Sequence, residues 1–73
     1  MNLLHPKKLL LSKWTAVHPV DRERHFLVSK VILPAMPGGK VDWVEVEAVH
    51  SKVVRRIAWR ELGDDTQWRQ GWV

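Results

Sequence analysis

The sequence predicts a small, mainly β domain: an antiparallel four-stranded meander, or an SH3-like half-barrel, with short helical turns at both termini. The chain has 73 residues, near the lower size for independent folding, so a single domain over residues 1–73 is expected. Two stretches in its second half alternate apolar and polar residues with a period of two, which is typical of half-buried strands. The prolines and this alternation disfavour a helical bundle.

The first half contains two expected strands. Residues 6–10 begin with proline, which the first position of a helix tolerates, and predict a single helical turn. Residues 12–17 favour an extended chain, and a charged connection follows over residues 20–24. Residues 25–33 are rich in β-branched and aromatic side chains, so they form the second strand.

The second half predicts a hairpin and two further strands. Two prolines and two glycines over residues 34–39 reverse the chain. Strands over residues 41–50 and 53–62 follow, and Val44, Val46 and Ala48 share one face of the first of them. With a tight turn at residues 51 and 52, the expected cross-strand pairs are Val46 with Ile57, Val44 with Trp59, Glu47 with Arg56, and Trp43 with Arg60.

The tail after Gly63 predicts a short helix. Asp64, Asp65 or Thr66 is a suitable cap. Trp68 and Trp72 lie four residues apart, the spacing that places two side chains on one helix face. This helix is expected to fold back over the open end of the sheet.

Five tryptophans must supply much of the core, because the chain has no cysteine for a disulfide or a thiolate metal site. Large aromatic side chains bury the most apolar surface per residue. The expected core residues are Trp14, Val44, Val46, Ile57, Trp59, Trp68 and Trp72.

Catalytic and cofactor motifs are missing from the sequence. The three serines have no nucleophile-elbow context, and the four histidines are not spaced as paired metal ligands. Phosphate-loop and dinucleotide fingerprints are absent. We therefore expect a non-catalytic binding module without a metal or a small-molecule cofactor.

The candidate binding surface is a sheet face that carries Trp43, Lys52, Arg56 and Arg60. Basic side chains beside an aromatic ring are typical of proteins that hold single-stranded nucleic acid through phosphates and stacked bases. This face predicts recognition of nucleic acid.

Two other interpretations use the same residues. Trp43 beside arginine also has the composition of a protein-interface hot spot, and an unpaired edge strand is able to accept a partner strand. The chain is then a protein-interaction adaptor, as a monomer or a dimer. The third interpretation is a solvated face without a partner, in which Glu47 pairs with Arg56 and Arg60 lies over Trp43.

The sequence also bears on location. The longest uninterrupted apolar run near the N-terminus is Leu9–Leu11, shorter than a signal peptide requires, and no stretch approaches the length of a membrane span. We expect a cytoplasmic protein.

Several motifs in fixed order resemble one family. They are HPKKLLLSKWTAV at residues 5–17, HFLVSKV at 25–31, EAV at 47–49, WREL at 59–62 and QWRQGW at 67–72. In this order they resemble the short tryptophan-rich proteins of bacteria, a family of uncharacterised function. The resemblance covers nearly the whole chain and is weakest over residues 34–43.

The resemblance implies a stand-alone bacterial domain and supplies no activity, cofactor or catalytic residue. If the recurrent motif residues are structural, their tryptophans (Trp14, Trp59, Trp68 and Trp72) are buried. Arg60 and Arg69 are then the motif residues left for binding.

Overall fold

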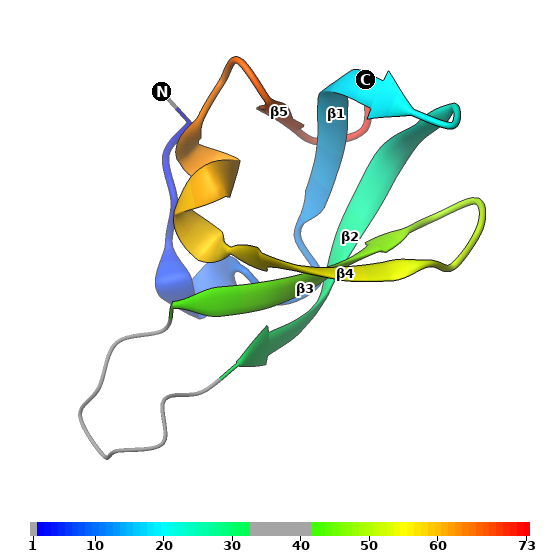
Figure 1. Cartoon of the computed structure of the whole chain (residues 1–73). Helices are drawn as coiled ribbons and strands as arrows, with labels where there is room; N and C mark the ends of the chain where they lie inside the picture. The colour runs from blue at the N-terminus through cyan, green and yellow to red at the C-terminus, as the bar shows by residue number, and fades with distance from the viewer. Residues whose placement is uncertain (1, 33–41) are drawn as a thin grey trace.

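The computed structural model describes residues 2–32 and 42–73, and its main feature is one antiparallel sheet of five strands (Figure 1). The order of the strands in the sheet is β4-β3-β2-β1-β5. The strands are β1 (Lys13–Val20), β2 (Glu23–Ile32), β3 (Trp43–Ala48), β4 (Val54–Ala58) and β5 (Trp68–Gln70). Two 3-10 helices accompany them, η1 (Pro6–Lys8) and η2 (Trp59–Gly63). The described residues contain no α-helix, and no helix there is long and apolar enough to cross a membrane.

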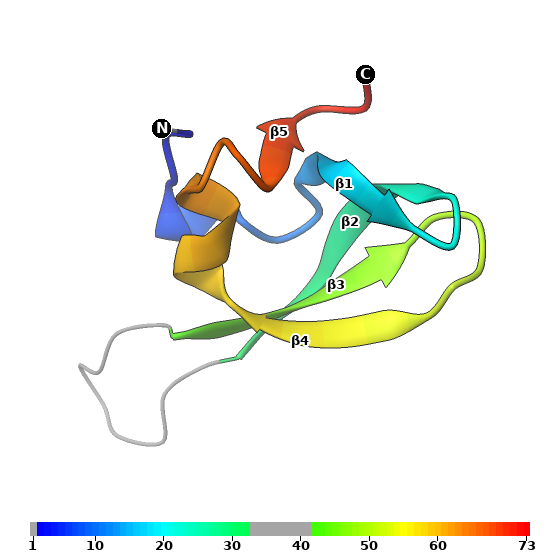
Figure 2. The same cartoon turned by 45° about the horizontal axis from the view of Figure 1, so that its top comes forward.

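The sheet is strongly bent, so that β1 and β5 face η2 across a concave side (Figures 1 and 2). The pairing of β2 with β3 shifts between Val28 and Lys30, and the pairing of β1 with β2 shifts between Thr15 and Val20. The first shift leaves one extra residue in β2, and the second leaves three extra residues in β1. Extra residues in one strand bend it and increase its twist. Both irregularities therefore help the sheet to curve around its core.

The core lies on the concave side and is made of alternate residues from neighbouring strands. Phe26 and Trp68 pack edge to face, with ring centroids 5.2 Å apart. Four expected core residues are buried (Trp14, Val44, Val46 and Trp68), and Ile57 and Trp59 pack against them half-buried. The mainly β class and the inward face of β3 are therefore confirmed.

The strand expected over residues 53–62 is too long. Pairing with β3 ends at Ala58, after which the Trp59 amide donates to the Asp42 carbonyl, and the chain enters η2. Residues beyond this point have no partner on β3, whose first residue is Trp43. The 3-10 helix instead directs Leu62 into the core.

The predicted register between β3 and β4 is wrong by two residues. Val44 lies opposite Ile57 rather than Trp59, and Glu45 lies opposite Arg56. The turn explains the shift: the Lys52 amide donates to the Ala48 carbonyl, and Lys52 has a positive φ of 67°, so the turn is longer than expected. A shift of two keeps each side chain on its face, because the period of a strand is two.

The expected C-terminal helix is a strand, and this raises the strand count from four to five. Residues 68–70 pair with β1 as β5, with Trp68 opposite Ala16. Gly71 then turns the chain with a positive φ of 80°. This turn ends the alternation of β5 before Trp72, so Trp72 leaves the core and is 42% exposed.

Trp72 lies instead on the convex side of β1 and β2. Its indole N–H donates to the Phe26 carbonyl at 2.9 Å, and the Lys13 ammonium lies 4.8 Å from its ring centroid. The tail beside it covers Thr15, whose hydroxyl donates to the Gly71 carbonyl. Trp72 therefore anchors the C-terminus rather than filling the core. The hairpin expected over residues 34–39 lies outside the described residues.

Leu62→Ala tests the role of η2. Leu62 is fully buried, so removing three of its carbon atoms should lower the free energy of unfolding by about 2–5 kcal/mol, through lost burial and a cavity. Leu3, which is 83% exposed, provides the matched control, and Leu3→Ala should change stability by less than about 0.5 kcal/mol. Thermal and urea unfolding of both variants measure this. Equal effects would contradict the assignment of Leu62 to the core.

Candidate functional site

The two edges of the sheet differ in how they are covered. Beside β5, the Asn2 amide group donates to the Trp68 carbonyl at 2.7 Å, and the Gln70 amide group donates to the Leu3 carbonyl at 2.7 Å. The N-terminal segment therefore lies against this edge. Among the described residues, no segment pairs with the outer side of β4. An exposed edge of this kind is a template for another strand.

The hydrogen bonds between β3 and β4 determine which backbone N–H and C=O groups of β4 point away from the sheet. The Ala48 amide donates to the Val53 carbonyl, and the Trp59 amide donates to the Asp42 carbonyl. In an antiparallel pair, residues that bond to the neighbouring strand alternate with residues that point away. Odd-numbered residues of β4 therefore face β3, and the N–H and C=O groups of Val54, Arg56 and Ala58 point away from the sheet.

Two consecutive arginines of β4 lie on opposite faces of the sheet. Arg55 lies opposite Val46, on the concave face, and its guanidinium carbon is 5.3 Å from the Phe26 ring centroid. Arg56 lies opposite Glu45 on the convex face, and its guanidinium is 3.6 Å from the Glu45 carboxylate. The expected pair of Arg56 with Glu47 is therefore replaced by one with Glu45, as the two-residue shift requires.

Exposed apolar side chains accompany this edge. Trp43 is 48% exposed and lies on the convex face opposite Ala58, whose small side chain separates it from the free side of β4. Val54, the first residue of β4, and Val53 before it are also exposed. Exposed aromatic and aliphatic groups beside arginine are typical of interaction surfaces.

A cleft of about 460 Å³ lies under β4, on the concave side. Phe26 and Trp68 contribute aromatic surface to it, and Arg55 and Ile57 of β4 line one of its sides. His18 and Val20 at the end of β1 also line the cleft, and so do three acidic residues, Asp21, Glu23 and Glu61. The cleft marks the place where the bent sheet fails to close between β4 and β1.

The structure gathers only part of the predicted binding face. Trp43 and Arg56 share the convex face of neighbouring strands. Lys52 lies in the turn before β4, and Arg60 lies in η2 beyond its other end. Arg60 is near Trp59 rather than Trp43, with its guanidinium carbon 6.0 Å from the Trp59 ring centroid.

Sequence analysis missed Arg55, at this edge, and Phe26, in the cleft beneath it. Arg55 directly precedes the predicted binding residue Arg56, and its position on the concave face follows from the strand parity that it shares with Ile57. That parity was visible in the sequence. The contribution of Phe26 to the cleft beneath β4 was not visible in the sequence, because it depends on the bend of the sheet.

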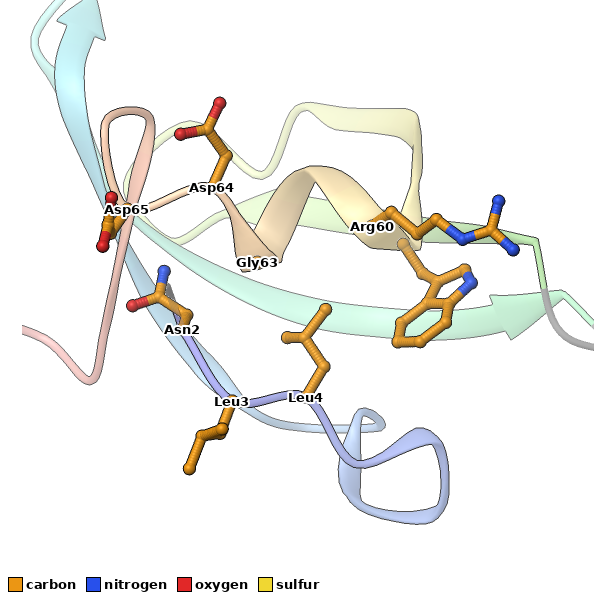
Figure 3. A pocket seen from close by; sticks show the side chains of 8 residues that line it. Asn2, Leu3, Leu4, Arg60, Gly63, Asp64 and Asp65 are labelled. Atoms are coloured by element: carbon orange, nitrogen blue, oxygen red, sulfur yellow. The ribbon is translucent and has the colours of Figure 1, made fainter.

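A larger hollow of about 650 Å³ lies between the N-terminal segment and η2 (Figure 3). Leu4 points toward η2 while Leu3 points away, and Arg60 lies at the opposite end from Asp64 and Asp65 (Figure 3). The Trp59 indole N–H is buried and has no acceptor within the described part of the chain. The charged groups around this hollow do not converge on one point.

Asp64 has a structural role at the rim of this hollow. Its carboxylate accepts hydrogen bonds from the Thr66 hydroxyl at 2.6 Å and from the Thr66 amide at 2.9 Å. These bonds favour the charged carboxylate and hold the pKa of Asp64 below its ordinary value of 3.8. Asp64 thus forms the turn before β5 instead of capping a helix. Residues 2–32 and 42–73 contain no group of three or more histidine and acidic side chains that could hold a metal ion.

Comparison with protein families shows which family the chain belongs to. Residues 12–73 match the family described as Tryptophan-rich protein (DUF2389), so the chain belongs to this tryptophan-rich family. No curated protein and no solved structure gives a significant match. The matched range includes all five strands and both edges of the sheet.

Asp64→Asn tests the turn before β5. Because the pKa of Asp64 is lowered in the folded state, its charge stabilises the fold above pH 3.8, and this stabilisation is lost as the pH falls through the folded pKa. The melting temperature of the wild-type domain should therefore fall more between pH 5 and about pH 2 than that of Asp64→Asn. Asp42→Asn, an exposed aspartate distant in sequence, is the control and should follow the wild type. Parallel curves for all three proteins would contradict the role of Asp64.

Proposed function

We propose that this member of the tryptophan-rich family is a non-catalytic protein-interaction module that adds an extended segment of a partner protein to the free edge of β4. The observation that carries the proposal is the edge of β4, which no strand within residues 2–32 and 42–73 pairs with, and its outward backbone groups at Val54, Arg56 and Ala58. Main-chain hydrogen bonds supply affinity in this mode of binding, and side-chain contacts supply specificity.

The surroundings of the edge support this proposal. Trp43 lies one strand inward from it and is exposed, and the cleft beneath it has an aromatic surface from Phe26 and Trp68. Alternate side chains of an added strand would therefore meet an exposed indole on one face and the cleft on the other. We place the module in the bacterial cytoplasm as part of the same proposal.

Recognition of single-stranded nucleic acid is the second candidate. Trp43 and Arg56 on the convex face support it, since stacking and phosphate contacts need both residue types. Glu45 and Glu47 lie on the same face, and Lys52 and Arg60 lie at opposite ends of β4. This mixture of charge gives phosphates a weaker site than a wholly basic face, so we favour the protein partner.

Ala58→Pro separates binding at the β4 edge from folding. Ala58 has a φ of −65°, the value that the proline ring imposes, and its N–H points away from β3. The substitution should therefore change the free energy of unfolding by less than about 1 kcal/mol. It removes one donor that an added strand needs. A library of displayed random 12-residue peptides is selected on the wild type, and the enriched peptides are titrated against Ala58→Pro. Binding should fall at least tenfold.

Ala58→Val is the matched control because it keeps the N–H while changing the side chain. Enriched peptides should bind Ala58→Val and should slow amide exchange at Val54, Arg56 and Ala58 in the wild type. Peptides that bind Ala58→Pro as tightly as the wild type would overturn the proposal. Saturable binding of a 12-nucleotide single strand that weakens steeply with salt, without any β4-dependent peptide, would establish the second candidate instead.

A further inference from the structure

A turn near the N-terminus presents two leucines to solvent. Leu10 is 55% exposed and Leu11 is 64% exposed, and both lie at the corner of the turn between η1 and β1. The Ser12 amide closes this turn by donating to the Leu9 carbonyl at 3.0 Å. Leu9 itself is buried in the core. The turn is therefore anchored inside the molecule while its corner carries two apolar side chains outside.

Hydrogen bonds fix the base of this turn. The Trp14 indole N–H donates to the Ser12 hydroxyl at 2.8 Å, and that hydroxyl donates to the Leu9 carbonyl at 2.5 Å. The Leu11 amide donates to the Val28 carbonyl of β2 at 2.8 Å. The two exposed leucines are thus held in a defined place, which lowers the conformational entropy lost when a partner covers them.

The backbone of Leu11 is unusual for its residue type. Leu11 has a φ of 64°, in the left-handed region that glycine and asparagine adopt more readily than leucine. The other described non-glycine residues with a positive φ are charged, namely Asp21, Arg22 and Lys52. An exposed leucine recovers little burial in return for this conformation. Residues that conflict with their local backbone are expected at functional sites, so the turn is a candidate for one.

Lysines flank the exposed leucines on both sides along the chain. Lys7 and Lys8 of η1 and Lys13 of β1 are exposed. Residues 1–20 contain no aspartate and no glutamate. The small hollow that Lys8 lines beside the N-terminal segment has no acidic residue in its wall. The turn is therefore an apolar tip within a basic surrounding.

Acidic side chains lie at the margin of this basic region. The register of the sheet places Glu47 of β3 two strands away from Lys13, with Leu27 between them. Asp65 lies in the turn before β5. In the described part of the chain, no carboxylate forms an ion pair with any of the three lysines. Their charges are therefore available to an anionic partner.

Trp72 extends the same region. The Lys13 ammonium lies 4.8 Å from its ring centroid, and the indole is 42% exposed. Leucine, tryptophan and lysine are residue types that proteins place at a membrane–water interface. Leucine enters the apolar layer there, the indole lies at the level of the headgroups, and lysine reaches the lipid phosphates. The N-terminal surface, as we call it, consists of Lys7, Lys8, Leu10, Leu11, Lys13 and Trp72.

We infer that the N-terminal surface docks on an anionic lipid membrane, with Leu10 and Leu11 in the apolar layer and the lysines at the lipid phosphates. Nucleic acid is a polyanion that offers aliphatic side chains no apolar layer. An acidic protein would need a groove shaped for the turn, whereas a lipid surface receives a protruding apolar tip without one. The negative potential of a cytoplasmic leaflet attracts lysines close to it.

The inference goes beyond the proposed function, because it gives the module a location. The N-terminal segment lies against β5, and β4 is at the other end of the strand order. A domain that is docked through the N-terminal surface therefore keeps the edge of β4 accessible to a partner strand.

Co-sedimentation of the full chain with lipid vesicles tests the inference. The chain should bind vesicles of phosphatidylcholine that contain about 30% phosphatidylglycerol, and it should bind pure phosphatidylcholine at least about tenfold more weakly. Binding to the anionic vesicles should also weaken as salt is raised, because salt screens the lysines.

Leu10→Ser/Leu11→Asn tests the apolar tip. This variant should bind the anionic vesicles about five- to twentyfold more weakly than the wild type, because two leucines no longer enter the apolar layer. Asparagine tolerates a positive φ, so its melting temperature should equal or exceed that of the wild type. Val53→Thr/Val54→Thr, which removes two exposed aliphatic side chains elsewhere, is the matched control and should bind as the wild type does.

Lys7→Gln/Lys8→Gln tests the basic surrounding. It should reduce binding to the anionic vesicles about tenfold, as expected for two lysines close to the surface. The matched control is Arg22→Gln/Lys52→Gln, which changes the net charge equally at exposed positions. These two residues lie in the β1–β2 and β3–β4 connections, at the opposite end of the molecule from η1 (Figures 1 and 2). This control should lose less than about twofold.

Four results would overturn the inference. The first is a wild type that does not bind anionic vesicles at low salt. The second is equal binding by Leu10→Ser/Leu11→Asn, which would show adsorption by charge alone, as would tighter, leucine-independent binding of a single-stranded oligonucleotide. The third is an equal loss in Arg22→Gln/Lys52→Gln, which would assign the effect to net charge. The fourth is a leucine-dependent dimer without vesicle binding, which would make a second copy the occupant.

Discussion

The edge-to-face contact between Phe26 and Trp68 joins the longest strand of the sheet to the last one. β5 has only three residues and pairs with β1 alone, so its few backbone bonds are weak support for the C-terminal part of the chain. Burying Trp68 against Phe26 supplies the apolar contact that holds this short strand in place. The N-terminal segment then bonds to β5 through Asn2 and Gln70. Both termini thus depend on one aromatic contact in the core.

The same contact determines which edge of the sheet stays open. Because Trp68 brings β5 and the N-terminal segment to the outer side of β1, that edge is occupied. The two register shifts bend the sheet toward closure, but β4 is still an edge strand among the described residues. A cleft rather than a strand pair separates β4 from the end of β1. The open edge is therefore a consequence of how a short chain distributes its few strands.

The residues predicted from the sequence are those whose position depends on local periodicity. Val44 and Val46 alternate with charged residues, so their burial follows from the period of a strand, whatever the register. Trp72 shows the limit of this approach. Its spacing from Trp68 suits a helix, but pairing of residues 68–70 with β1, a long-range event, decides that the segment is extended. Turn length, which fixes the register of β4, is equally hidden from periodicity.

The sequence predicted residue types of the candidate site but not its place in the sheet. Sequence analysis identified Arg56 and Trp43, and strand parity divides Arg55 and Arg56 between two faces, but the position of β4 at an edge depends on the order of the strands. A run of basic residues on one surface would favour a polyanion such as nucleic acid. Basic residues divided between the two faces of one edge instead match a strand, because only a strand presents consecutive side chains to both faces at once. The geometry of the edge, more than the net charge of +4, is therefore the basis on which we propose a protein partner.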